Sequence, residues 1–249
     1  VTYYNLNNEI NRPINGSIML NKDKEALKAF FKENVKPNYL RFDSLQDKLD
    51  YLLENNYIEK GFLNKYSYEF VIKLFKFVYS KDFRFKSFMA AYKFYSQYAM
   101  KTNDNTKYLE SFEDRVAFNA LYFANGDEEL AWSLAGELIN QRYQPATPSF
   151  LNAGRARRGE FISCFLLDVT DDMNSIGRSI NSALQLSKLG GGVGINLSNI
   201  REAGASIKGY EGAASGVVPI MKMLEDSFSY ANQLGQRQGA GAVYLNVFH

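Results

Sequence analysis

The sequence predicts an α/β protein in which a mostly helical N-terminal part precedes the first strands of a parallel sheet. Up to about residue 153, apolar residues recur at helical spacing, whereas short apolar runs alternate with amphipathic segments from residue 154 onward. The order strand, helix, strand, helix, strand is typical of parallel α/β architecture. With 249 residues, 46% of them hydrophobic, the chain can bury one large or two ordinary cores.

The N-terminal helices are predicted from the spacing of their apolar residues. Segments 23–35 and 44–56 each place leucine, phenylalanine or alanine every three or four positions, and segment 68–104 is long enough for two further helices. Aromatic residues on one face with lysines opposite are typical of a core-facing helix with a solvated outer face.

Segment 111–141 predicts a helical hairpin. Ser111 and Asp114 have the spacing of a capping box at the start of its first helix. Asn125, followed by glycine, suits the left-handed backbone that ends a helix, and Asp127 can cap the next one. The hairpin leads into a loop with two prolines and two glycines, residues 142–159.

The second part of the chain contains three apolar runs that we expect to be strands, joined by two helices. The runs are 160–169, 190–200 and 241–248, and the helices span 173–189 and 216–235. The first run is typical of a strand buried on both faces. Three strands form neither a closed barrel nor a comfortable open sheet, so we expect the domain to continue beyond this sequence.

Composition narrows the classes of function. The formal net charge of +2 gives no extended basic field for nucleic acid, and no apolar run is long enough to cross a bilayer. One cysteine, Cys164, and one histidine, His249, exclude a disulfide framework and the usual zinc sites. We expect a cytoplasmic protein whose chemistry is carried by Cys164 or completed by another polypeptide.

Three motifs each allow two interpretations. The glycines of KLGGGVGIN, among them Gly192, suit either a helix cap with a tight turn or a backbone that approaches a ligand closely. The loop ANQLGQRQGAGA, with Gln233 and Arg237, suits either recognition of a nucleotide base or a mobile surface loop. Cys164 is either a small buried hydrophobe or a thiol at a strand end beside a polar pocket.

These motifs, taken in order, resemble those of the large (alpha) subunit of class Ib ribonucleoside-diphosphate reductase. The resemblance is carried by residues 142–249, including GEFISCFLLDVTDD, and extends upstream through 83–104 and 108–127. It implies about the N-terminal third of that subunit, as a fragment or as one half of a split enzyme. The implied domains are an N-terminal helical region (1–82), a helical domain (83–153) and an incomplete start of a ten-stranded α/β barrel (154–249).

The resemblance also implies a reaction. The family reduces ribonucleoside diphosphates to deoxyribonucleoside diphosphates by thiyl-radical chemistry, the reaction that supplies deoxyribonucleotides for DNA replication. Cys164 matches one member of the cysteine pair that provides the electrons and becomes a disulfide. Thr147, Ser163 and Gly192 match substrate-contact positions, together with Cys164 itself.

An allosteric site is implied as well. Asp171, Arg201 and Lys208 match positions that bind a deoxynucleoside triphosphate effector; Asp171 is also explained as a plain helix cap, and both roles can hold at once. Gln233 and Arg237 match the loop that relays the identity of the effector to the substrate pocket.

The implied partners complete the enzyme. They are the remaining part of the large subunit, a small (beta) subunit whose dimetal centre generates the radical, a glutaredoxin-like or thioredoxin reductant, and a second copy joined through the effector site. The chain itself would hold no metal and no cofactor apart from its dNTP or ATP effectors, and would be inactive alone. The alternative is a non-catalytic nucleotide-binding and dimerisation module.

Overall fold

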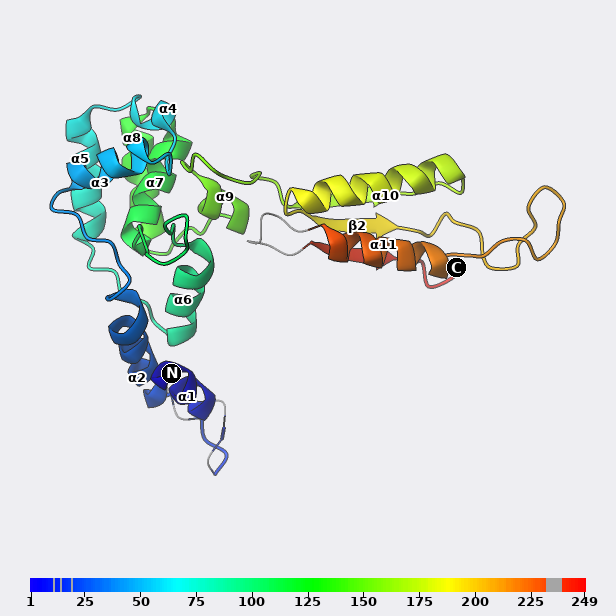
Figure 1. Ribbon diagram of the computed structural model, residues 1–249, viewed down its shortest axis with the longest axis horizontal. Helices are drawn as coiled ribbons and strands as arrows, with labels where there is room; N and C mark the ends of the chain where they lie inside the picture. Colours follow the sequence, from blue (N-terminus) through cyan, green and yellow to red (C-terminus); the bar gives the residue numbers. More distant parts are fainter. Residues whose placement is uncertain (11, 14, 19, 232–238) are drawn as a thin grey trace. The chain divides into compact units, whose positions relative to one another are not determined.

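The computed structural model describes residues 1–10, 12–13, 15–18, 20–231 and 239–249, and it divides them into two compact units. Unit 1 spans Val1–Arg158 and unit 2 spans Gly159–His249. In Figure 1 the helices of unit 1 run from blue to green, and the strands and helices of unit 2 from yellow to red. Among the described residues, no helix combines the length and apolar character needed to span a membrane.

Unit 1 is helical, as the sequence predicted. Two of its helices continue into a π-helical turn, η1 (Phe31–Val35) and η2 (Phe94–Tyr98). The α-helices described in this unit are α1 (Thr2–Ile10), α2 (Asn21–Phe30), α3 (Leu45–Glu54), α4 (Lys60–Leu63), α5 (Tyr68–Tyr79), α6 (Phe88–Lys93), α7 (Phe112–Ala124), α8 (Glu128–Ile139) and α9 (Thr147–Asn152).

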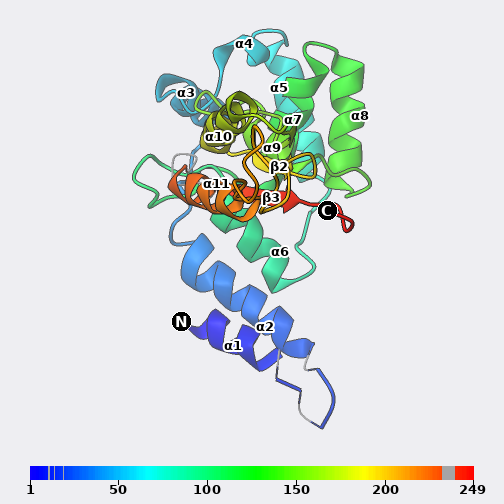
Figure 2. The same cartoon turned by 90° about the vertical axis from the view of Figure 1, so that its right-hand side faces the viewer.

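Helix α1 was not predicted because its polar sequence lacks a clear apolar period, and tertiary contacts hold it in place. Figure 2 shows α1 beside α2, and the two helices contact each other. Tyr3 is buried, with its ring 5.2 Å from that of Phe30 and 5.8 Å from that of Phe88. Aromatic pairs at these separations stabilise such a contact beyond the area they bury.

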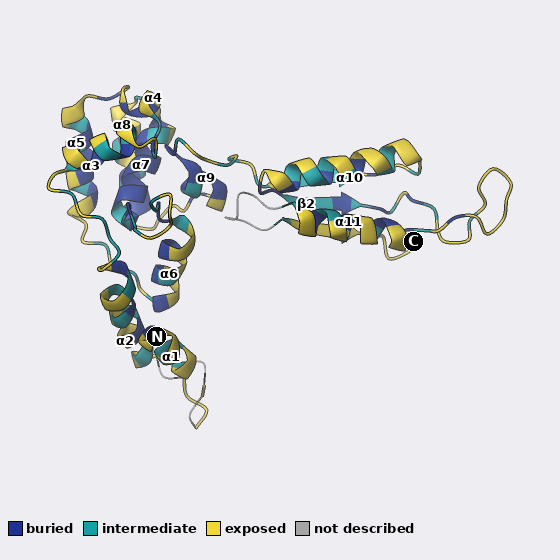
Figure 3. Ribbon diagram, viewed as in Figure 1, coloured by how far each residue is buried: buried dark blue, intermediate teal, exposed yellow. Residues whose placement is uncertain are grey.

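Helix α7 is the centre of unit 1. It contacts α4, α5, α8 and α9, and Figure 3 shows it almost entirely in the colour of buried residues. A helix that is buried on all sides needs apolar residues all round, and Phe118, for example, lies 5.4 Å from Phe75 between ring centroids. Its polar residues Asp114, Arg115 and Asn119 are also buried, so each must be paired within the unit.

The predicted hairpin caps are confirmed. Ser111 and Asp114 form a complete capping box at the start of α7. Asn125 ends that helix with a left-handed φ of 52°, and Asp127 accepts a 2.9 Å hydrogen bond from the Leu130 backbone at the start of α8.

Asp114 is also the centre of a buried polar network. Lys48 Nζ lies 2.5 Å from Oδ2, and the hydroxyls of Tyr39 and Tyr79 donate to the carboxylate at 3.0 and 2.8 Å. Burial by itself raises the pKa of Asp114, but the Lys48 ammonium and the hydrogen bonds from Lys48, the Ser111 backbone and Tyr79 outweigh it, so the pKa lies below its ordinary value. The carboxylate therefore stays charged at neutral pH.

Unit 2 contains the predicted strand–helix–strand–helix–strand order. The three strands are parallel, in the order β1-β2-β3, which together with the helical unit before them confirms the predicted fold class. The elements are β1 (Cys164–Asp168), α10 (Met173–Lys188), β2 (Gly192–Asn196), α11 (Val218–Tyr230) and β3 (Ala240–Tyr244).

Both helices of unit 2 cover the same face of the sheet. Val193 and Ile195 of β2 are buried in one cluster with Ala183 of α10 and Leu224 of α11. The opposite face is open: Leu166, in the middle of β1, is 82% exposed. The expectation that the first strand is buried on both faces is therefore wrong for this chain, because α10 and α11 supply only one covering layer.

Candidate functional site

The first candidate site lies on the open face of the sheet, where the three strands begin. Cys164 opens β1 and its side chain is exposed. In the strand register it stands opposite Gly192 of β2, which stands opposite Ala240 of β3. The Ser163 carbonyl accepts a 2.7 Å hydrogen bond from the Gly192 backbone, and the Ser163 hydroxyl lies 3.9 Å from the Cys164 sulfur. Cys164 is thus an accessible thiol, and the buried-hydrophobe interpretation is wrong.

Each of the three neighbouring glycines has a different physical explanation. Gly190 ends α10 with a φ of +83°, as a helix cap requires. A Cβ on Gly191 would lie 2.4 Å from the Phe165 ring, so this glycine permits close packing. A Cβ on Gly192 would meet only the Ser163 carbonyl oxygen, at 3.6 Å. Capping and packing therefore explain the first two glycines, whereas Gly192 leaves bare backbone beside the thiol.

Thr147 belongs to unit 1. It is the first residue of α9, a six-residue helix inside the segment that the sequence predicted as a loop. Pro148 follows it and suits a first helical turn, where its missing N–H has no partner to lose. The Thr147 side chain is exposed, and its hydroxyl forms a 3.0 Å hydrogen bond with that of Tyr98. Of the predicted substrate residues, the structure brings together Ser163, Cys164 and Gly192.

The second candidate site follows the carboxyl ends of the strands. Asp171 Oδ2 lies 2.5 Å from Arg201 Nε, and Arg201 Nη1 donates to the Ser206 carbonyl at 3.0 Å. Asp172 rather than Asp171 caps α10, accepting a 2.8 Å hydrogen bond from the Ser175 backbone. The plain-cap interpretation of Asp171 is therefore wrong, because its neighbour does the capping and leaves Asp171 to pair with Arg201.

Lys208 lies on the same loop, farther along. It is exposed, with a left-handed φ of +50°, inside the turn closed by the mutual backbone hydrogen bonds of Ile207 and Tyr210. Among the described residues, no hydrogen bond or ion pair connects Lys208 with the Asp171–Arg201 pair. The structure thus joins two of the three predicted effector residues.

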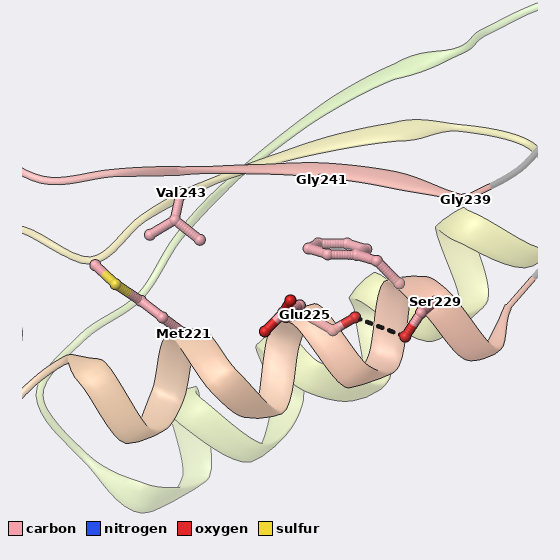
Figure 4. A pocket seen from close by; sticks show the side chains of 7 residues that line it. Met221, Glu225, Ser229, Gly239, Gly241 and Val243 are labelled. Atoms are coloured by element: carbon pink, nitrogen blue, oxygen red, sulfur yellow. Dashed lines mark hydrogen bonds between the residues drawn. The ribbon is translucent and has the colours of Figure 1, made fainter.

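The loop residues Gln233 and Arg237 lie outside the described residues. Directly after them, Gly239 and Gly241 contact α11 so closely that a Cβ on Gly241 would lie 1.9 Å from the Phe228 ring. A cavity of 410 Å³ borders this contact between α11 and β3, with Glu225 and Val243 in its lining (Figure 4). Figure 4 also shows α10 and α11 on the same side of the strands.

A polar group at the carboxyl ends of the strands was not singled out from the sequence. Asn196 donates to Asp168 at 3.0 Å, Ser198 donates to Asn196 at 2.7 Å, and the Asn246 backbone donates to Ser198 at 2.9 Å. These residues line an open cavity of 580 Å³ on the uncovered face. A polar residue near the end of each apolar run was the available signal, because ligands of parallel sheets gather at these ends.

No metal centre is evident in the part of the chain that the structure describes. No group of three or more His, Cys, Asp or Glu side chains there is placed to hold an ion. Among the described residues of unit 2, the groups that could bind or react with a ligand include the thiol, the bare backbone beside it, the Asp171–Arg201 pair and the polar group around Asn196.

Three family models match consecutive parts of the chain. They describe the ribonucleotide reductase N-terminal region (residues 3–83), all-alpha domain (84–158) and barrel domain (162–249). The ribonucleoside-diphosphate reductase subunit alpha of Bacillus subtilis is 54% identical over 244 residues, which are 98% of this chain and 35% of that protein. The subunit alpha of Mycoplasma pneumoniae is 53% identical over 227 residues, 91% of this chain and 32% of that protein.

The chain belongs to the ribonucleotide reductase family. It matches the N-terminal region of the large subunit and spans about a third of the length of these relatives. All three strands of this ribonucleotide reductase chain lie in residues 162–249, the part that matches the barrel domain. This agrees with the expected partial α/β barrel.

Proposed function

We propose that this chain is the N-terminal part of the large subunit of a class Ib ribonucleoside-diphosphate reductase, and that Cys164 is one of its two reducing cysteines. The observation that carries the proposal is the exposed thiol on the open face of the sheet, in register with the bare backbone of Gly192. An accessible thiol beside backbone that carries no Cβ can approach a sugar and take part in redox exchange.

The proposed reduction needs two thiols. Cys164 is the only cysteine of this sequence, so the second thiol comes from a cysteine outside it. A thiyl radical, generated with the help of the small subunit, activates the ribose of a ribonucleoside diphosphate. The C2′–O bond breaks and the oxygen leaves as water, while the two thiols give up two electrons and two protons and form a disulfide. A thioredoxin or glutaredoxin-like reductant then restores the dithiol.

In this proposal Thr147, Ser163 and Gly192 contact the substrate. Hydroxyl groups are suitable donors for the oxygens of a sugar and a diphosphate, and a glycine lets the backbone come close to them. The exposure of the Thr147 hydroxyl and the open face at Gly192 support these roles.

The effector site is proposed at Asp171, Arg201 and Lys208, with a deoxynucleoside triphosphate or ATP as ligand. A guanidinium and an ammonium suit a triphosphate, and a carboxylate can accept hydrogen bonds from a ribose. The Asp171–Arg201 ion pair supports this placement. Gln233 and Arg237 would relay the effector's identity, and a second copy of the subunit would complete the site.

In the whole enzyme this chain would act together with the remaining part of the large subunit and a small subunit whose dimetal centre generates the radical. A separate reductant would regenerate the thiols, and the enzyme would work in the cytoplasm. The domain division at 1–82, 83–153 and 154–249 is part of this proposal. The reaction needs residues outside this chain, so we expect the isolated chain to be inactive. The alternative is a non-catalytic nucleotide-binding and dimerisation module, in which Cys164 would have no part in the reaction.

The test is Cys164→Ser in the full-length large subunit, assembled with the small subunit and assayed for reduction of radiolabelled cytidine diphosphate. We expect turnover with a thioredoxin-type reductant to fall at least 100-fold, because no disulfide can form. Binding of thymidine triphosphate, measured by calorimetry, is the control and should be unchanged. Turnover at the wild-type rate would favour the non-catalytic module.

A further inference from the structure

We propose that Tyr98 is a positioning residue for substrate binding, which acts by fixing the hydroxyl of Thr147. The inference rests on the proposed substrate contact of Thr147 and extends it to a residue 49 positions away in the sequence. The two hydroxyl oxygens are 3.0 Å apart, within ordinary hydrogen-bond distance.

Three interactions fix Tyr98: one of its backbone turn, one of its carbonyl and one of its ring. It is the last residue of the π-helical turn η2, which the Ala99 backbone closes with a 2.8 Å hydrogen bond to the Phe94 carbonyl. Its own carbonyl accepts from Arg155 Nη2, and its ring lies 5.8 Å from the buried ring of Phe150. Single π-helical turns occur frequently at functional sites.

Hydrogen bonds from α7 side chains hold the C-terminal end of α9. Arg115 donates to the carbonyls of Leu151 and Ala153, and Asn119 donates to that of Phe150 at 3.0 Å. Arg115 and Asn119 are fully buried, so these bonds are shielded from water. This end of α9 is consequently anchored to α7 by buried hydrogen bonds.

A buried carboxylate connects this anchor with the segment that carries Tyr98. Glu110 lies 3.2 Å from both Arg115 and Arg155, and it accepts a 2.9 Å hydrogen bond from the Met100 backbone. The turn that presents Tyr98 and the helix that presents Thr147 are therefore attached to the same charged cluster. The hydrogen bond between the two hydroxyls joins them at the exposed end.

The chemical consequence concerns the direction of the Thr147 hydroxyl hydrogen. A hydroxyl group has one donor and two acceptor positions. When the Tyr98 phenol donates to Thr147 Oγ1, the threonine hydrogen is directed away from the ring and is available to an acceptor such as a diphosphate oxygen. Without the phenol, the Thr147 side chain must be ordered by the substrate, which weakens substrate binding.

The test is Tyr98→Phe in the full-length enzyme assembled with its small subunit, with cytidine diphosphate as substrate. The substitution keeps the ring that packs on Phe150 and removes only the hydroxyl. We expect KM to rise about 2- to 10-fold, the effect of one lost neutral hydrogen bond, while kcat stays the same. Tyr79→Phe, which removes a hydroxyl bonded to Asp114 instead, is the matched control and should leave KM unchanged.

A double-mutant comparison separates positioning from a general structural effect. Thr147→Val should also raise KM, and Tyr98→Phe should add nothing in the Thr147→Val background. Additive effects of the two substitutions, or an unchanged KM in Tyr98→Phe beside a raised one in Thr147→Val, would overturn this inference alone. An unchanged KM in Thr147→Val would overturn the proposed substrate role of Thr147 as well, whatever the result for Cys164→Ser.

Discussion

Asp114 concentrates several stabilising interactions of unit 1 in one carboxylate. It closes the capping box of α7, and it neutralises Lys48, a lysine that is only 6% exposed. An ammonium group buried to this extent depends on its partner, because an unpaired charge in a core is strongly destabilising. The same carboxylate also accepts hydrogen bonds from two tyrosine hydroxyls whose pKa values are raised by burial and by the charge of Asp114.

Replacing this carboxylate should therefore cost substantial stability. We expect Asp114→Asn to lower the free energy of unfolding by about 3 kcal/mol at pH 7, since it leaves Lys48 buried without a counterion. Urea unfolding of the chain measures this value. Glu137→Gln, at the exposed ion pair with Arg142, is the control and should leave the unfolding midpoint unchanged.

The same variant should alter the dependence of stability on pH. The folded-state pKa of Asp114 lies below its ordinary value, so its contribution is complete above about pH 4 and is lost as the pH falls through the folded-state pKa. Wild-type protein should accordingly lose stability on acidification more steeply than Asp114→Asn. Parallel pH profiles of the two proteins would contradict the assigned charge of Asp114.

At the scale of elements, the contact between α11 and β3 depends on a missing side chain. The position that a Cβ on Gly241 would occupy is already filled by the Phe228 ring, at 1.9 Å. We expect Gly241→Ala to push α11 from the sheet and to destabilise the chain by about 1–3 kcal/mol, the usual cost of overpacking. Thermal unfolding followed by circular dichroism gives the measurement.

Gly177 in α10 provides the matched control, because a Cβ there would meet nothing within 4 Å. Gly177→Ala should stabilise the chain by about 0.5–1 kcal/mol, since alanine suits a helix interior better than glycine. Adding Phe228→Leu to Gly241→Ala should recover part of the loss. Equal melting temperatures for Gly241→Ala and wild type would show that the helix and the strand are not in this contact.

Elements with a long apolar period or an explicit cap could be predicted from the sequence, and shorter ones could not. The capping box at Ser111 and the order of strands and helices in unit 2 are local patterns, so they were predictable. Helix α9 is only six residues long and begins at a Thr-Pro pair, which by itself is typical of a loop. Its helical form depends on the buried donors Arg115 and Asn119, which lie about thirty residues earlier in the chain.

The candidate site was predictable to a similar degree. Cys164 and Gly192 lie in strands that the sequence located, and the parallel pairing then places them opposite each other. The partners Asp171–Arg201 and Tyr98–Thr147 are 30 and 49 residues apart, and only tertiary structure brings them together. That Cys164 is exposed follows from the single layer of helices, which no local pattern in β1 reveals.

At the scale of the whole molecule, this chain provides only one of the two thiols that the proposed reaction needs. The Cys164 sulfur lies on the open face of the sheet, at the amino ends of the strands. The chain spans about a third of the length of its relatives. We therefore propose that Cys164 forms a disulfide with a cysteine of the remaining subunit, once for each deoxyribonucleotide produced.

The most direct measurement follows the oxidation state of Cys164 through one turnover. The full-length subunit is reduced, freed of external reductant, and allowed to react with its small subunit, effector and cytidine diphosphate, after which differential alkylation and mass spectrometry report each thiol. We predict that Cys164 becomes protected from alkylation in proportion to the deoxycytidine diphosphate formed, in a disulfide with a cysteine from outside residues 1–249. A Cys164 that remains a free thiol while product accumulates would contradict the account.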